Sequence, residues 1–203
     1  MSSSNPVPAA VNNQSLRVTN LAWDFLRPVI KPGDTVIDAT AGTGQDTLFL
    51  TQCVGETGHV LAFDVQTAAL QQTQAAVEKS GFAGNITLIH KSHDLLPEVL
   101  KQQGIPEQTV TAMMFNLGYF PGGDQAIITK AETTIKALDG ALTLLASGGM
   151  ITICLYPGHP GGLAESEAVL NWCEALEKPF IAHHFRTLNR KSPPTLAMIQ
   201  RTR

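Results

Sequence analysis

The sequence predicts a single α/β domain built on a doubly wound, mostly parallel sheet of seven strands, with an antiparallel strand at one edge. Three observations lead to this prediction. Short apolar runs alternate with helix-length segments through five units, glycine-rich turns follow several of these runs, and two strand-like segments lie close together near the C-terminal end. Alternating strands and helices form parallel sheets covered by helices on both faces, and a terminal strand pair adds the antiparallel edge.

The N-terminal part divides into a tail and the start of this domain. Residues 1–14 are rich in Ser, Asn and Pro, so we expect them to be disordered. The domain is then expected to span residues 15–203. Its first segment, 15–30, has helical spacing of apolar residues, and a Pro-Gly-Asp turn at 32–34 leads into the first strand.

The central motif is TVIDATAGTGQDT, residues 35–47. Its apolar run ends at Asp38, a loop of small residues contains Gly42 and Gly44, and a helix is expected from Gln45. A strand that turns through glycines into a helix presents free backbone N–H groups at the carboxyl edge of a sheet. Such a turn binds the polar part of a nucleotide-like cofactor, although a plain strand–helix turn is an alternative.

The acid Asp38, directly before this loop, helps to decide which cofactor the loop binds. A dinucleotide motif, G-x-G-x-x-G, would need a third glycine where Thr47 stands, and Asp38 would face a negatively charged pyrophosphate. S-adenosylmethionine instead carries an ammonium and a sulfonium, which an acid attracts. The motif therefore favours S-adenosylmethionine, with another nucleotide as the alternative.

The second strand ends in another acid that fits this interpretation. Residues 59–64 form an apolar run that ends at Asp64, roughly 20 residues after the glycines, where an acid hydrogen-bonds the cofactor ribose. Asp64 could instead cap the helix expected over 67–80, which Gly81 ends. The two roles are compatible.

The remaining elements place three unusual loops at one edge of the sheet. The loops are KSHD (91–94), NLGYFPGGD (116–124) and YPGHPGG (156–162), and such loops carry function in this architecture. Asn116 stands where many amino-methylating enzymes have an Asn or Asp, or it is a turn residue that bonds its own backbone. The expected elements are strand 85–90, helix 95–102, strand 109–115, helix 130–146, strand 150–155, helix 163–176, and strands 180–188 and 195–201.

Composition limits the compartment and the cofactors. The three cysteines, Cys53, Cys154 and Cys173, are far apart and form no C-x-x-C pair, which favours a reducing compartment and argues against zinc. The histidines show no metal spacing either, so we expect no metal. No apolar run is long enough for a membrane span, and no secretion signal is evident. We expect a cytoplasmic protein, with a processed organellar form and a homodimer left open.

The charge of the chain is unevenly distributed. The net charge is −3, yet residues 178–203 hold six of the 14 Lys and Arg residues and none of the 17 acids, so residues 1–177 carry eight basic residues against 17 acids. A basic end on an acidic body could contact nucleic-acid phosphates. Alternatively, these charges only keep a sheet edge soluble.

Together, the motifs DATAGTGQDT, FDVQ, KSHD, FNLGYFPGGD and YPGHPGG resemble a bacterial and plant family of class I methyltransferases. The family was formerly described as rRNA methylases and is now linked to tRNA wobble-uridine methylation (the MnmM or YtqB-like enzymes). The resemblance covers about residues 16–200, and NLGYFPGGD is its most specific part. The family often has Asn at the position of Thr43, His at that of Gln45 and His at that of Pro157, so the chain departs from the pattern there.

The resemblance implies an activity: transfer of a methyl group from S-adenosylmethionine to the aminomethyl group of 5-aminomethyl-(2-thio)uridine at wobble position 34 of tRNA, with the anticodon loop as partner. The alternatives are methylation of rRNA or a small molecule, and a cofactor-binding module without activity. A dehydrogenase is disfavoured by Thr47 and by the lack of a substrate domain. The expected catalytic residues are Asp38, Asn116, Tyr156 and His159; cofactor contacts are expected from Asp38, Gly42, Thr43, Gly44, Gln45, Asp46, Asp64, Gln66, Ser92, His93 and Asn116, and RNA contacts from Tyr119, Arg186, Arg190 and Lys191.

Overall fold

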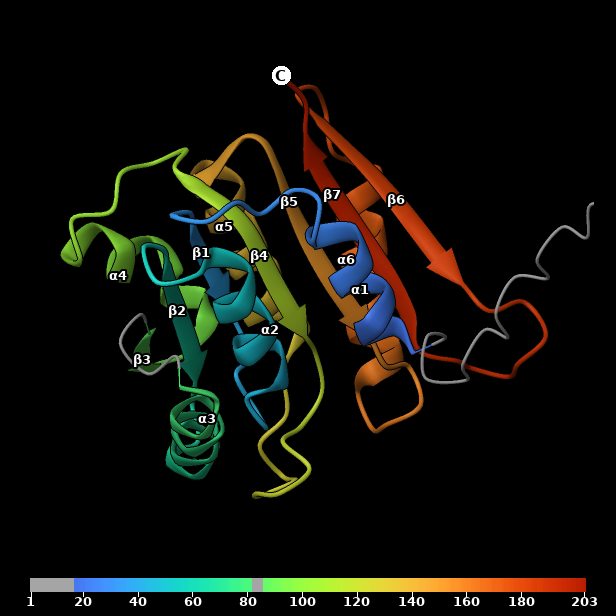
Figure 1. Cartoon of the computed structure of the whole chain (residues 1–203). Coiled ribbons are helices and arrows are strands. Elements are labelled where there is room, and N and C mark those ends of the chain that lie inside the picture. The colour runs from blue at the N-terminus through green and yellow to red at the C-terminus, as the bar shows by residue number, and fades with distance from the viewer. Residues whose placement is uncertain (1–16, 82–85) are drawn as a thin grey trace, which may run out of the picture.

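The computed structural model describes residues 17–81 and 86–203 (Figure 1). The tail expected over residues 1–14 lies outside this range, as do the first residues of the helix expected from residue 15 and of the strand expected from residue 85. In the described part of the chain, no helix is long and apolar enough to cross a membrane. The same residues contain no group of three or more His, Cys, Asp or Glu side chains that could hold a metal ion.

Within the described residues, a seven-stranded sheet organises the fold, in the order β3-β2-β1-β4-β5-β7-β6. Strands β1 to β5 pair in parallel, whereas β7 runs antiparallel to both β5 and β6. The predicted fold class is confirmed, with the antiparallel strand one place in from the edge. The strands are β1 (Thr35–Asp38), β2 (His59–Asp64), β3 (Ile86–His90), β4 (Val110–Asn116), β5 (Leu145–Leu155), β6 (Phe180–Arg186) and β7 (Thr195–Arg201).

Helices cover both faces of this sheet, with α1, α2 and α3 on one side and α4, α5 and α6 on the other (Figure 1). Successive side chains of a strand point to opposite faces, so Val36 packs with α1 and α2 while Ile37 packs with α4 and α5. Both residues are fully buried. The helices are α1 (Val18–Leu26), α2 (Gln45–Val54), α3 (Thr67–Ser80), α4 (Leu96–Gln102), α5 (Ala131–Leu144) and α6 (Gly162–Glu174), with a short 3-10 helix, η3 (His93–Leu95).

One boundary differs clearly from the sequence prediction. The helix expected over 130–146 ends at Leu144, and β5 begins directly at Leu145 rather than at Met150. Between these points the strand bulges, because Leu145 pairs with Val110 while Met150 pairs with Ala112. The glycines at 148 and 149, between the expected helix and the expected strand, therefore lie in the bulge, where Gly148 has a φ of +79°.

Other boundaries shift by a few residues. The first helix ends at Leu26 instead of residue 30, α6 covers Gly162–Glu174 instead of 163–176, and β6 ends at Arg186 instead of residue 188. Asn116 is the last residue of β4 and not the first residue of the loop. The carboxyl ends of β1 to β5 meet at one edge of the sheet, and β1 and β4 are neighbours at the point where the winding reverses. Open α/β sheets bind ligands there.

Candidate active site

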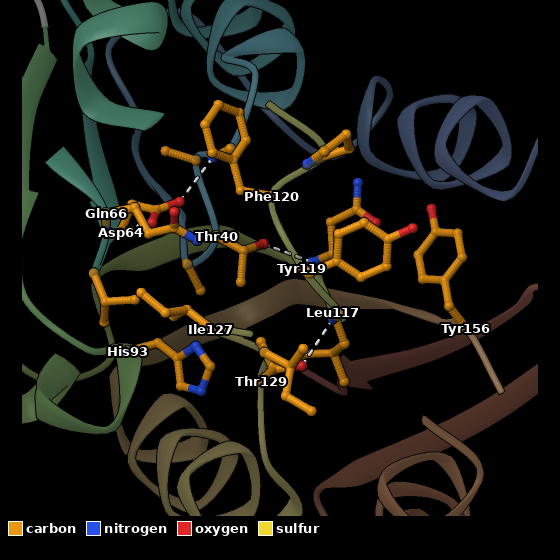
Figure 2. Close-up of a pocket in the computed structure, with 18 of the residues that line it drawn as sticks. Thr40, Asp64, Gln66, His93, Leu117, Tyr119, Phe120, Ile127, Thr129 and Tyr156 are labelled. Atoms are coloured by element: carbon orange, nitrogen blue, oxygen red, sulfur yellow. Dashed lines mark hydrogen bonds between the residues drawn. The ribbon is translucent and has the colours of Figure 1, made fainter. Parts of the chain in front are cut away.

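A cavity of about 560 Å³ lies at this edge, lined by the loops after β1 to β5, by Thr19 of α1 and by the turn between β6 and β7. Twelve of the predicted site residues line it. Figure 2 shows Asp64, Gln66 and His93 on one side of the cavity and Tyr119 and Tyr156 on the other. The twelve are Gly42, Thr43, Gln45, Asp46, Asp64, Gln66, Ser92, His93, Asn116, Tyr119, Tyr156 and His159.

Asp64 fixes the conformation of the glycine-rich loop through a hydrogen bond. The Gly42 N–H donates a hydrogen bond to Asp64 Oδ2 at 3.0 Å (Figure 2). The Gln66 N–H donates to Asp64 Oδ1 at 2.8 Å. Gly42 has a φ of +51°, a conformation that L side chains rarely adopt. Asp64 does not cap α3, since Gln66 is the N-cap residue and makes no side-chain cap bond. Asp64 therefore orders the loop and still lines the cavity.

Gly44 has a role in helix packing. It does not line the cavity; it occupies the N-cap of α2 with a φ of +80°. A Cβ there would lie 2.8 Å from Thr73 Cα, so glycine allows α2 to pack closely against α3. The expected contact between Gly44 and the cofactor stays a prediction.

The position of Asp38 also differs from the prediction. Asp38 is fully buried below the loop and does not line the cavity. Its carboxylate accepts hydrogen bonds from Thr47 Oγ1 at 2.6 Å and from the Thr40 N–H at 3.1 Å. In this structure its oxygens hold the loop from beneath, so a contact of Asp38 with cofactor or substrate stays a prediction.

Asp46 is the buried acid that does reach the cavity. It is 5% exposed and accepts hydrogen bonds from Trp23 Nε1 at 2.7 Å and, more weakly, from Asn116 Nδ2 at 3.4 Å. Burial raises the pKa of Asp46. Burial and the charge of Asp46 together raise the pKa of Asp38 to about 7. Among the described residues, neither acid forms an ion pair, so a cation in the cavity would relieve their mutual repulsion.

Asn116 connects this acid to the opposite wall. Its N–H donates to Thr40 Oγ1 at 2.7 Å, which ties the end of β4 to the loop after β1 (Figure 2). Burial raises the pKa of Tyr156, and a hydrogen bond with the Asn116 side chain partly offsets that shift. The Tyr156 phenol is therefore neutral at pH 7. A chain of polar groups runs from Tyr156 through Asn116 to Asp46.

His93 lines the cavity, and one of its ring nitrogens is buried without a hydrogen-bond partner in the described part of the chain. The residue is 6% exposed, and its Nε2 has no hydrogen-bond partner among the described residues. Burial lowers the pKa of His93, so the ring is neutral near pH 7. Its ring meets the edge of Phe115 with centroids 5.9 Å apart. A buried polar atom without a partner is costly, so this nitrogen needs an explanation.

On the substrate side, His159 and Tyr119 lie against each other. Their rings meet edge to face with centroids 6.0 Å apart, and His159 Nδ1 lies 2.9 Å from the Pro160 carbonyl oxygen. His159 Nε2 is buried without a partner among the described residues. A Cβ at Gly118 would lie 3.4 Å from that atom, an ordinary contact, so it is the φ of +124° that favours glycine here. Tyr119 is 43% exposed at the cavity mouth.

Residues 117–129, which we call the strap, cross the carboxyl edge of the sheet. At the tip of the strap, the Gln66 side-chain amide pairs with both backbone groups of Asp124, accepting from its N–H at 3.0 Å and donating to its carbonyl at 3.3 Å. The glycine at 123 permits this approach, because a Cβ there would lie 2.4 Å from Gln66 Oε1. Gln66, expected as a cofactor contact, thus lines the cavity while its amide anchors the strap.

The three basic residues expected to contact RNA lie near the cavity and not in its wall. Arg186 ends β6, and Arg190 and Lys191 lie in the turn before Ser192 and Pro194, both of which line the cavity. Lys178 and Arg201 lie at the other end of the sheet, since Phe180 pairs with Arg201 and Arg186 with Thr195. Only half of the basic end therefore faces the cavity side.

Several residues that support the site were not predicted from the sequence. Trp23 fixes Asp46 and stacks on Phe49 at a centroid distance of 5.1 Å, yet in the sequence it looks like an ordinary apolar residue of a helix. Thr40 was not among the predicted site residues, yet it lines the cavity and its hydroxyl accepts a hydrogen bond from the Asn116 N–H. Glu165 lies outside every motif. Only its spacing after the YPGHPGG loop, in the first turn of α6, could have drawn attention to it.

The raised pKa of Asp38 predicts a pH effect on stability. Between its ordinary value of 3.8 and about 7, the folded protein binds a proton that the unfolded chain has released. The stability that Asp38 contributes is therefore present at low pH and is lost as pH rises through this window. The advantage in unfolding free energy of wild type over Asp38→Asn should fall by more than about 1 kcal/mol between pH 5 and pH 8.

Urea unfolding at pH 5, 6, 7 and 8 would measure this difference, with the exposed Asp24 changed to Asn as the control. A difference between wild type and Asp38→Asn that stays constant over that range would show that Asp38 ionises normally in the folded protein.

The fold and this site define the architecture of a class I methyltransferase: a glycine-rich turn after the first strand, an acid after the second, and a seven-stranded sheet whose β7 is antiparallel. The family model described as "Putative rRNA methylase" matches residues 60–201. The chain belongs to this family, a group of S-adenosylmethionine-dependent methyltransferases, as its motifs predicted.

Relatives with known names or structures agree with this assignment. The "tRNA (mnm(5)s(2)U34)-methyltransferase, chloroplastic" of Arabidopsis thaliana is 35% identical over 196 residues, which are 92% of this chain and 69% of the plant protein. A putative rRNA-methylase from Clostridium thermocellum superposes with a TM-score of 0.83 and 36% identity, covering 94% of this chain and 98% of its own. SMU.1697c of Streptococcus mutans, a putative methyltransferase solved in complex with SAH, superposes with a TM-score of 0.78 and 34% identity. The match covers 91% of this chain and 97% of its own.

Proposed function

We propose that this protein is a tRNA methyltransferase that uses S-adenosylmethionine to methylate the aminomethyl group of 5-aminomethyl-(2-thio)uridine at wobble position 34. The observation that carries the proposal is a single cavity with an acid-rich glycine loop at one side and Asn116, Tyr156 and His159 at the other. The plant relative named above, a tRNA methyltransferase for that position, supports the choice of substrate. We treat residues 15–203 as the methyltransferase domain.

The residues present fit the cofactor. Asp38 and Asp46 are buried acids without a basic partner among the described residues, and the cofactor brings an ammonium and a sulfonium. Asp64 remains at the cavity wall as an acceptor for ribose hydroxyls. We place His93 in the wall on the adenine side. We assign Asp46 to the ammonium, and Ser92, Thr43 and Gln45 to the remaining wall.

For this reaction the protein mainly has to position and desolvate the two reacting groups, and acid–base catalysis contributes less. The bound cofactor supplies a methyl group on a sulfonium, which leaves as a neutral thioether. The substrate nitrogen attacks with its lone pair, so an N–C bond forms as the C–S bond breaks, and the proton of the alkylammonium is lost to water. The site must hold the neutral amine in line with the methyl group. We assign this role to Asn116, with Tyr156 as its buried partner.

RNA enters through the open side of the cavity in this proposal. A wobble base in the anticodon loop must be splayed out to reach a buried methyl donor. Tyr119 is exposed at the mouth and could stack on that base, next to His159. The turn with Arg190 and Lys191 adjoins the same mouth and could contact phosphates.

Mass spectrometry of tRNA nucleosides would test the activity. tRNA that carries 5-aminomethyl-uridine is incubated with the protein and S-adenosylmethionine labelled in its methyl group. The proposal expects label in 5-methylaminomethyl-uridine at position 34. Label in rRNA and not in tRNA would overturn the choice of substrate. Cofactor binding without label in any RNA would leave a small-molecule methyltransferase or a non-catalytic module.

Two substitutions separate the two halves of the cavity. Asn116→Ala and His159→Ala should each lower kcat by about five- to tenfold, the effect of losing a hydrogen bond or two to the substrate. Cofactor affinity, measured by calorimetry, should change less than twofold. Equal losses in turnover and cofactor affinity would instead make these residues structural or cofactor-binding. Exposed Gln71→Ala on α3 serves as a control.

A further inference from the structure

A buried acid outside the cavity wall ties together the two loops of the substrate side. Glu165, in the first turn of α6, is 3% exposed and accepts hydrogen bonds from Thr129 Oγ1 and Thr134 Oγ1, both at 2.7 Å. Among the described residues, no Lys or Arg forms an ion pair with it. A buried carboxylate is costly unless its oxygens are satisfied. Here two threonine hydroxyls and the helix N-terminus meet that need.

The bond to Thr129 continues into the strap. The Gly118 N–H donates to Thr129 Oγ1 at 2.8 Å, and the Thr129 N–H donates to the Gly118 carbonyl at 2.8 Å. Tyr119 and Ile128 form an isolated antiparallel bridge one step further along. The two ends of the strap are thus paired at its base, and Figure 2 shows Thr129 at the cavity with its bond to the residue after Leu117.

The direction of this chain of hydrogen bonds starts at Glu165. Both of its oxygens accept from threonine hydroxyls, so the Thr129 hydroxyl gives its hydrogen to Glu165. The oxygen of that hydroxyl then has lone pairs for the Gly118 N–H. A neutral amide at position 165 could present an N–H₂ group to Thr129, and the hydroxyl would lose its acceptor.

The same acid links the strap to the second substrate-side loop. Helix α6 begins at Gly162, directly after the loop that carries His159, and the Glu165 N–H donates to the Gly161 carbonyl at 3.1 Å. The His159 ring in turn lies over Gly118 and against Tyr119. Movement of Glu165 would therefore shift both loops relative to each other.

We propose that Glu165 is a positioning residue, which acts through Thr129 to set the strap and thereby the place of Tyr119 and His159 against the substrate base. The inference rests on the proposed function for the identity of that base. The ordering of the strap does not depend on that function, because it follows from hydrogen bonds within this chain.

The test compares two hydroxyl partners of the same carboxylate. Glu165→Gln and Thr129→Val should raise the tRNA KM about three- to tenfold, with the Kd of S-adenosylmethionine changed less than twofold. Thr134→Val removes the other bond to Glu165, from α5, and leaves the strap contact in place. It should lower Tm about as much as Thr129→Val while KM stays within twofold of wild type. Thr129→Ser keeps the hydroxyl and should restore KM.

Hydrogen exchange followed by mass spectrometry gives a readout without any RNA. Peptides covering residues 117–129 should exchange at least threefold faster in Glu165→Gln and Thr129→Val than in wild type or Thr134→Val. Equal KM and exchange effects from Thr129→Val and Thr134→Val, or a Thr129→Ser variant as impaired as Thr129→Val, would overturn the proposal. A wild-type protein inactive on tRNA would refute the proposed function and leave the exchange result to decide the role of Glu165.

Discussion

Replacing Asp64 with alanine should weaken S-adenosylmethionine binding by about 1.5–3 kcal/mol, roughly 10- to 150-fold in Kd, as expected for the loss of a charged hydrogen-bond acceptor. The structure adds a second reason. The two carboxylate oxygens also accept hydrogen bonds from the N–H groups of Gly42 and Gln66. The variant therefore loosens the glycine-rich loop and the backbone of Gln66, whose side chain binds the strap. Isothermal titration calorimetry measures the change directly.

The matched control is Glu56→Ala, which removes an exposed acid in the turn before β2, at the opposite edge of the sheet. It changes the net charge equally and should leave the affinity unchanged. Asp64→Asn retains one acceptor oxygen and should fall between wild type and Asp64→Ala. If Asp64→Ala binds the cofactor as tightly as wild type, Asp64 does not belong to the cofactor site.

The local pattern of the chain predicted most of the fold. The strand at 59–64, the helix at 67–80 and the strand at 195–201 were predicted with their observed bounds, because an acid, a glycine or a turn marks one end of each. These signals act over a few residues, so sequence alone exposes them. The position of each loop at the carboxyl edge then follows from the alternation of strands and helices.

The differences arose where distant residues decide the structure. Leu145 and Ala146 have good helix propensity, yet pairing with β4 draws them into β5. Asp38 follows the motif of a ligand-facing acid, but the Thr47 hydroxyl, where a dinucleotide motif has glycine, turns its carboxylate inward. Nothing local could reveal that Trp23 would hold Asp46, because these residues meet only once α1 packs on the sheet.

The basic residues of the C-terminal end are separated in space by the fold. By sequence, its six Lys and Arg residues form one group. In the structure, the hairpin of β6 and β7 separates them. Arg201 is also occupied, because it donates to the Leu145 carbonyl and to Gln108 Oε1, both at 2.8 Å. This leaves Arg186, Arg190 and Lys191 as the basic residues of this end that lie on the cavity side.

The double change Arg190→Glu and Lys191→Glu should therefore weaken tRNA binding strongly. A unit charge about 4 Å from a phosphate contributes about 1 kcal/mol in water, and reversing it changes the interaction by about 2 kcal/mol, roughly 30-fold per residue at low salt. For every phosphate that the protein no longer neutralises, the log–log salt dependence of binding should also flatten by about 0.7–0.9. Filter binding of tRNA from 50 to 300 mM salt would measure both quantities.

The control reverses the same number of charges at the far end of the sheet, with Lys178→Glu and Arg203→Glu. Long-range attraction depends on net charge and is equal in the two double variants, whereas phosphate contact is not. The far-end variant should therefore bind less tightly only at low salt, where screening is weak, and should keep the wild-type slope. If the two variants behave alike, the turn between β6 and β7 serves only to keep the sheet edge soluble, and tRNA must dock on the strap and the YPGHPGG loop alone.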